Sequence, residues 1–288
     1  MKRYYYKFVI ENGQKNFKYI DNGLTDEELS LSQKLDNIIL TAERLMRMHR
    51  IMVDSFLKLK QVNFQKLRRA GDTDQINELV INFISNAKLF IDYLDRRWSP
   101  KYIPKFNKKW KTQCSAFYDS SESYRLCYHL RNFVQHSGAL PIKQVIETPG
   151  SDRSKVNTDL VLNIDAFKDF EDEFEKTNIA NSYWEDANNW SFMKHANAYV
   201  AQLIALYQLA LAEYIKDNKD TLDEIQAKIK DTVLRNVRNA IMWSNTSPQD
   251  VPNAKKQNNF TLHPIVTLPD LSRFYRKLEE EKIVKIER

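Results

Sequence analysis

The sequence predicts a mainly α fold, a helical bundle with a small N-terminal β-hairpin and minor β elements. Its 288 residues include five glycines and eight prolines, too few for the many tight turns of an all-β fold. Apolar residues recur at helical spacing over long stretches, and a chain of this length can bury a substantial core. Asn12-Gly13 between two aromatic, β-branched runs is the sequence signature of a hairpin.

The hairpin is expected from residues 4–10 and 17–20, which flank that turn. Two strands alone are barely stable, so the hairpin needs cover from the helical body. We expect it to form a first segment at residues 1–22, followed by the helical bundle at 24–230 and an accessory segment at 231–288.

The first helix is expected to begin at a capping box, Thr25 with Glu28 three residues later, and to run to Arg69 before Gly71 stops it. The next helix is expected to continue to Trp98, because two prolines follow. The remaining expected elements are a basic aromatic connector (101–118), a helix (124–136), two short strands (142–146 and 160–164), an acidic helix from 163 or 165, helices at 190–215 and 221–243, an irregular stretch (244–270) and a charged amphipathic helix (271–286).

Composition leaves the partner open. The formal net charge is +6 with a pI near 9.0, which suits nucleic acid but does not require it. Cys114 and Cys127 fit neither a zinc site nor a disulfide framework, so we expect no metal and no cofactor. We find no apolar run long enough to cross a bilayer and no signal-peptide core at the start, so we expect a cytoplasmic protein without membrane contact.

The strongest candidate site is Arg131-Asn132-x-x-x-His136, near the end of the helix expected at 124–136. An arginine can hold a phosphate and stabilise added negative charge, and an imidazole can move protons at neutral pH. On an ideal helix, Arg131 and His136 point about 140° apart. They can serve one phosphate if the arginine arm reaches round, if the last turn unwinds, or if a symmetry-related helix supplies the complement.

Further candidate substrate contacts lie on either side of this motif. Arg125 and His129 form one polar ridge with the motif's asparagine and histidine. They either contact substrate or occupy a solvated or interface position. Lys108, Lys109 and Lys111 surround a tryptophan, as in single-strand RNA binding. A solvated loop anchored by that tryptophan is the alternative.

Arg131-Asn132-x-x-x-His136 resembles the R-x4–6-H signature of the HEPN superfamily, in which the arginine is typically followed by Asn, Asp or His. The resemblance implies a helical bundle that dimerises and brings two motifs into a shared cleft. It also implies a metal-independent endoribonuclease of the toxin–antitoxin or anti-phage type. Arg131 and His136 would then be catalytic, Asn132 would support them, and RNA, a second copy of the chain and an antitoxin protein would be partners.

The mechanism that the resemblance implies is attack of the ribose 2′-OH on the adjacent phosphate, which yields a 2′,3′-cyclic phosphate and a 5′-OH end. His136 would move protons, Arg131 would stabilise the anionic transition state, and Asn132 could orient His136 from one turn away. A non-catalytic HEPN-like module for nucleotide binding or dimerisation is the leading alternative. A DNA-binding regulator is disfavoured because no recognition-helix pattern is present.

Overall fold

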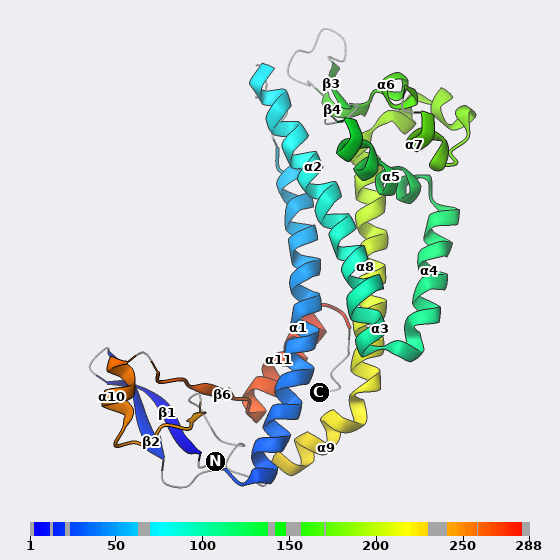
Figure 1. The fold of residues 1–288 in the computed structure, drawn as a ribbon. Coiled ribbons are helices and arrows are strands. Elements are labelled where there is room, and N and C mark those ends of the chain that lie inside the picture. The colour runs from blue at the N-terminus through cyan, green and yellow to red at the C-terminus, as the bar shows by residue number, and fades with distance from the viewer. Residues whose placement is uncertain are drawn as a thin grey trace. The chain divides into compact units, whose positions relative to one another are not determined.

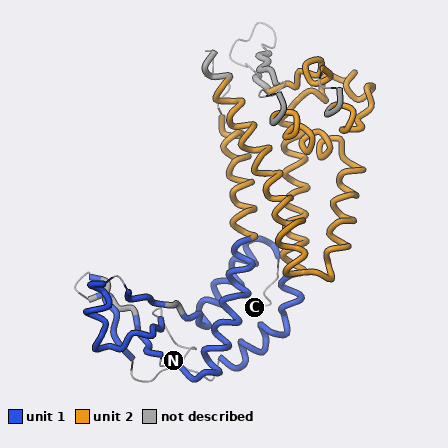
Figure 2. The backbone as a smooth tube through the Cα atoms, viewed as in Figure 1, with its two compact units in different colours: residues 1–44, 214–288 blue, residues 45–213 orange. Residues whose placement is uncertain are grey.

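The computed structural model describes residues 3–11, 14–20, 24–62, 70–137, 142–147, 157–169, 171–229, 241–257 and 259–283 (Figure 1). The fold is mainly helical, with a small N-terminal strand pair and minor strands, as the sequence predicts. The chain forms two compact units, one of residues 1–44 and 214–288 and the other of residues 45–213 (Figure 2). The three segment boundaries expected from the sequence stay predictions, because a compact unit is not thereby an independently folding domain.

The first unit contains an antiparallel sheet. Strands β1 (Tyr4–Glu11) and β2 (Gln14–Ile20) pair with Tyr5 opposite Ile20, which confirms the hairpin. β1 also pairs with β5 (Ile241–Ser244), and β5 pairs with β6 (His263–Ile265), so the described strands lie in the order β2-β1-β5-β6. The hairpin therefore gains a neighbouring strand from the distant C-terminal part of the chain.

Two sequence expectations in this region are wrong. Residues 241–243 were expected to end a helix that starts near residue 221, but the helix α9 is Lys219–Ile229 and Ile241–Ser244 is a strand. The stretch 244–270 was expected to be irregular, yet it contains β6 and the short helix α10 (Val251–Lys256). A short apolar run does not distinguish strand from helix by its periodicity, so the pairing with β1 decides the outcome.

The helices of the first unit are α9, α10, α11 (Leu268–Glu280) and the adjoining parts of α1 (Asp26–Lys60) and α8 (Phe192–Asp217). The capping box at the start of α1 is confirmed: the Glu28 carboxylate accepts from the Thr25 N–H at 2.8 Å, and Thr25 Oγ1 accepts from the Glu28 N–H at 3.1 Å. Ser32 Oγ joins α1 to the residue after β6 by donating to the Val266 carbonyl at 2.9 Å. The sheet is thereby tied to the helices that flank it in sequence.

The second unit is a bundle of long helices with a small strand pair. It contains the later part of α1, most of α8, and the following: α2 (Ala70–Tyr93), the π-helical turn η2 (Leu94–Trp98), α3 (Ser99–Tyr102), η3 (Pro104–Phe106), α4 (Asn107–Ser120), α5 (Glu122–Ser137), β3 (Ile142–Glu147), β4 (Asn157–Leu162), α6 (Ile164–Lys168), α7 (Glu171–Lys176), η4 (Asn181–Glu185) and η5 (Ala187–Trp190). Large side chains fill its core, among them the fully buried Trp98, Trp110 and Phe83. Aromatic burial of this size is a major source of stability.

The bundle corrects three expectations and confirms one. α1 ends at Lys60, and Gly71 is the second residue of α2, where the first-turn N–H groups need no helical partner and glycine costs less than in a helix interior. The connector expected at 101–118 is largely helical, because α4 begins directly after Phe106. The single acidic helix expected after residue 163 is two short helices, α6 and α7. The helix expected at 124–136 is confirmed as α5.

The helix α8 bears on the expectation that no apolar run is long enough to cross a bilayer, while the absence of membrane contact stays a prediction. By length and composition it is apolar enough to cross a bilayer, contrary to the sequence reading. Half of its most apolar stretch is buried inside the structure. The central helix of a soluble bundle has the same property.

Candidate functional site

The motif helix α5 is positioned by a capped start and a buried apolar face. Ser121 precedes the helix, and its side-chain oxygen accepts from the Tyr124 N–H at 3.2 Å, which satisfies one of the unpaired first-turn donors. Leu126, Leu130 and Phe133 are buried. α5 contacts α2, α4 and α7, so its orientation is determined from several sides.

One polar side of α5 is held by hydrogen bonds. The guanidinium of Arg125 donates to the Tyr118 carbonyl at 3.0 Å and to the Asp119 carbonyl at 2.8 Å, and it lies 3.5 Å from the Glu122 carboxylate. These bonds satisfy carbonyls at the end of α4, which lack helical partners. Arg125 therefore joins the end of α4 to the start of α5.

His129 belongs to the same side. Its Nε2 lies 2.8 Å from the Tyr118 hydroxyl, which itself donates to the Lys176 carbonyl at 3.0 Å. Because that hydroxyl has one proton, the network assigns the donor role in the first bond to His129 Nε2–H. Arg125 and His129 are both buried, at 9% and 7% exposure. Their predicted contact with substrate stays a prediction, and the structure gives each of them a bridging role within the bundle.

The motif residues Arg131 and Asn132 have different surroundings. Both are half-buried, and within the described part of the chain no hydrogen bond or ion pair engages either side chain. His136 lies in the last turn of α5, but its side chain is outside the part that the structure describes. α5 remains helical through Ser137, so the unwinding of the last turn is not seen. Helical geometry then keeps Arg131 and His136 about 140° apart around the axis.

No protein-family model, curated protein or solved structure matches this chain. Its function must therefore be inferred from its own residues and their geometry.

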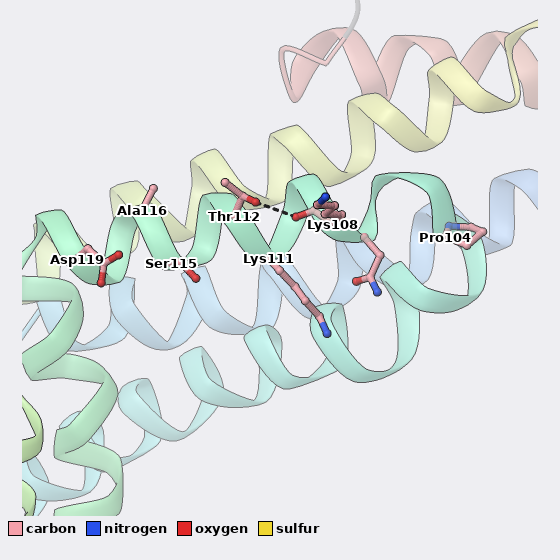
Figure 3. A pocket seen from close by; sticks show the side chains of 8 residues that line it. Pro104, Lys108, Lys111, Thr112, Ser115, Ala116 and Asp119 are labelled. Atoms are coloured by element: carbon pink, nitrogen blue, oxygen red, sulfur yellow. Dashed lines mark hydrogen bonds between the residues drawn. The ribbon is translucent and has the colours of Figure 1, made fainter.

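The predicted substrate lysines lie on α4 rather than on a loop. Lys108 and Lys111 line an open depression of about 750 Å³, together with residues along the length of α4 (Figure 3). Thr112, also in its lining, donates to the Lys108 carbonyl at 3.0 Å. Lys109 differs from its neighbours, because its ammonium lies 3.4 Å from the Glu213 carboxylate. All three remain candidates for substrate contact, and the two that line the depression have no ion pair within the described residues.

A second depression of about 580 Å³ opens between α2, η2, α4 and α5. Three tyrosines line it, Tyr118 from α4 and Tyr124 and Tyr128 from α5, and Lys88 and Arg96 contribute cations. Lys111 and Ser115 line both depressions, so these two residues of α4 form a ridge between them. The polar groups of this second depression come from separate helices, so the pattern of any single helix does not reveal that they lie together.

The thiols and carboxylates of the described residues give little sign of metal chemistry. Burial, and to a lesser extent the nearby Asp95 carboxylate, raises the pKa of the Cys114 thiol to about 12, and burial also raises the pKa of Cys127. Such thiols stay protonated at neutral pH and are poor nucleophiles and metal ligands. Across the ranges that the structure describes, no group of three His, Cys, Asp or Glu residues could hold a metal ion.

The tyrosines of the second depression were not predicted as site residues from the sequence. Tyr124, Tyr128 and Arg131 are spaced i, i+4 and i+7, so helical geometry places them within about 60° of one another on α5. That spacing was available in the sequence and marks one face. The sequence does not show that Lys88 and Arg96, which come from earlier elements of the chain, border the same face.

Proposed function

We propose that the chain is a metal-independent endoribonuclease of the HEPN-like type, with Arg131 and His136 as its catalytic pair. The observation that carries the proposal is the Arg131-Asn132-x-x-x-His136 spacing within the last two turns of α5, with no described partner for the first two side chains. A guanidinium without a partner among the described residues is available to a phosphate, with which it forms paired hydrogen bonds.

In the proposed reaction the ribose 2′-oxygen forms a bond to the adjacent phosphorus, and the bond from phosphorus to the 5′-oxygen breaks. The 2′-OH gives up its proton to a base, and the departing 5′-oxygen takes one from an acid. His136 supplies one or both of these proton transfers. Arg131 stabilises the additional negative charge on the phosphoryl oxygens, and Asn132 orients the imidazole from one turn away.

A second copy of the chain completes the proposed site. Because α5 is helical through Ser137, the backbone positions of Arg131 and His136 in one helix lie about 140° apart around its axis. Two such helices related by a two-fold axis can place the arginine of one beside the histidine of the other, and each half of the interface repeats the arrangement. We therefore propose a homodimer with composite sites.

A non-catalytic nucleotide-binding or dimerisation module is the second candidate function. It is favoured by the depression lined by Tyr124 and Tyr128, which could hold a nucleotide on the face of Arg131 without any chemistry. In both cases we propose a cytoplasmic protein, and for the nuclease we propose a role in a toxin–antitoxin or anti-phage system with an antitoxin protein as a further partner.

The test is cleavage of single-stranded RNA in EDTA by the wild type, Arg131→Ala, His136→Ala and the control Arg97→Ala, whose side chain is exposed on η2. We expect cleavage by the wild type and the control, a 2′,3′-cyclic phosphate product, and no cleavage of DNA, which lacks the nucleophile. Cleavage by His136→Ala at the wild-type rate would contradict the assignment. Loss of the dimer in both motif variants would favour the module.

A further inference from the structure

The second depression has an aromatic wall. The rings of Tyr118 and Tyr128 meet edge to face with centroids 5.9 Å apart, and those of Tyr118 and Tyr124 with centroids 6.5 Å apart. Tyr124 is almost fully buried, whereas Tyr118 and Tyr128 are half-buried and therefore reachable. Aromatic rings on a surface are the usual platform for nucleobases, since every base has a π-face.

Cations from three elements border this wall. The ammonium of Lys88 lies 4.7 Å from the centroid of the Tyr128 ring and 2.6 Å from the Asp92 carboxylate, so Asp92 uses one of its three donors. Arg96 from η2 and Lys111 from α4 are exposed, and the Arg96 side chain retains 73% of its accessibility. The Arg96 Nε lies 3.9 Å from Asp92, which leaves its terminal nitrogens for an incoming anion. A phosphate near the opening would thus meet at least two cations.

The π-helical turn η2 also brings a carboxylate to this depression. Asp95 lines it and is half-buried, and no described residue forms a hydrogen bond or ion pair with it. π-helical turns occur frequently at functional sites. An unpaired carboxylate accepts hydrogen bonds from amino groups, and adenine, guanine and cytosine carry an exocyclic amino group that uracil lacks.

The depression lies on the face of the proposed catalytic arginine. Tyr128 precedes Arg131 by three residues, so the two are neighbours one turn apart on α5. Arg131 continues the half-buried face that Tyr128 begins, while Arg125 and His129 are buried. A strand whose scissile phosphate lies at Arg131 would place a neighbouring base close to the tyrosines.

We propose that this depression binds one unpaired nucleobase, with its attached phosphate, of a single-stranded RNA. Tyr128 and Tyr118 contact the base, Asp95 accepts from its amino group, and Arg96 and Lys111 contact the phosphate. The inference depends on the proposed function for RNA as the substrate. A free nucleotide offers the same chemistry and is separated from RNA by the experiment.

The test measures binding without cleavage. A fluorescein-labelled 2′-O-methyl oligoadenylate cannot be cut by 2′-OH attack, and its affinity for the full chain is followed by fluorescence anisotropy at low and high salt, with adenosine 5′-monophosphate as competitor. We expect Tyr128→Ala to weaken binding about tenfold to hundredfold and Tyr128→Phe, which keeps the ring, to retain it. Arg96→Ala should weaken binding and lower the salt dependence by about one counterion.

Arg97 provides the matched control, because it is the next residue of η2, is exposed and does not line the depression. Arg97→Ala should bind like the wild type, and Asp95→Asn should reduce the preference for oligoadenylate over oligouridylate. Tight binding of the oligonucleotide with weak competition by the monophosphate supports an RNA subsite, whereas equal affinities make the ligand a free nucleotide and overturn the RNA assignment.

The same experiment separates this inference from the proposed function. If the protein never cuts RNA but binds the oligonucleotide in a way that depends on Tyr128 and Arg96, the nuclease proposal is rejected and the base-site proposal is retained. No binding at all, or equal losses in Arg96→Ala and Arg97→Ala, overturns the base site even if RNA is cleaved. Arg96 is so exposed that its replacement leaves the fold intact, so the comparison does not depend on the tyrosine variant folding.

Discussion

The fold treats two pairs of polar residues on α5 in opposite ways. Arg125 and His129 are buried, and their side chains are bonded to Tyr118, Asp119 and Glu122. Arg131 and Asn132, one to two turns later, are half-buried and have no bonded partner among the described residues. Both pairs have the residue types of a phosphate site, so composition alone does not separate them.

The difference indicates that a polar side chain whose hydrogen-bond partners lie inside the protein mainly stabilises the fold. A buried polar group is costly unless it is hydrogen-bonded, which explains why the first pair is held by several acceptors. A group that the fold leaves unbonded at the surface is available to a ligand. On this basis we propose that Arg131 acts on substrate, whereas Arg125 stabilises the junction of α4 and α5.

The largest expected effect is on catalysis. Arg131→Ala should lower the rate of RNA cleavage about 100-fold to 1000-fold, because one donor to the transition-state oxygens is lost. Its stability should stay within about 0.5 kcal/mol of the wild type, as for other surface substitutions. Single-turnover cleavage and urea unfolding of the same preparation measure both. If the lost cleavage is accompanied by a large loss of unfolding free energy, Arg131 stabilises the fold and does not act directly on the substrate.

A half-buried histidine outside α5, His49 of α1, provides a contrast with His129. His49 stacks on Tyr207 with ring centroids 3.8 Å apart, and burial, aided by Arg50, lowers its pKa to about 4. Between pH 6.5 and about 4 the unfolded chain binds a proton that the folded chain does not, so stability falls with falling pH, by at most about 1.4 kcal/mol per pH unit. His49→Phe should flatten this part of the pH profile in urea unfolding. An unchanged profile would show that the ring titrates freely.

Arg125→Ala should act on stability. Its removal leaves the carbonyls of Tyr118 and Asp119 without their donor and should destabilise the protein by about 1–3 kcal/mol. Urea unfolding beside Arg131→Ala gives the measurement. A stable Arg125→Ala protein that no longer binds RNA would reverse the two roles.

Tyr118→Phe should have the smallest effect. The phenol bridges His129 and the Lys176 carbonyl, and loss of this bridge should cost about 1 kcal/mol while the aromatic wall remains. Thermal unfolding together with oligonucleotide anisotropy checks it: stability should fall and affinity should not. A drop in affinity alone would place the hydroxyl in contact with the base.

Much of the fold was predictable from local pattern. The hairpin follows from alternating strands around Asn12-Gly13, the start of α1 from its Thr25–Glu28 capping box, and α5 from apolar residues at helical spacing. Local pattern failed where distant partners decide. Ile241–Ser244 is a strand because β1 lies beside it, and the basic run at residues 107–120 is a helix because its buried Trp110 packs into the bundle.

The candidate site was predictable in part for the same reason. The Arg131 and His136 spacing is local and visible in the sequence. The proposed base site is not visible in the sequence, because its tyrosines come from α4 and α5 and its cations from α2, η2 and α4. Nor does the sequence reveal that Arg125 and His129 would find internal partners, since those partners are mostly backbone carbonyls and a hydroxyl from neighbouring elements.

Mixing two inactive variants tests the composite site most directly. The Arg131→Ala and His136→Ala proteins should each have little activity alone, but unfolding and refolding them together allows mixed dimers. In a mixed dimer, one composite site has an intact arginine from one subunit and an intact histidine from the other, so random pairing should restore about a quarter of the wild-type cleavage rate. If the mixture stays as inactive as its components while mixed dimers are present, no site is shared between subunits and the account is contradicted.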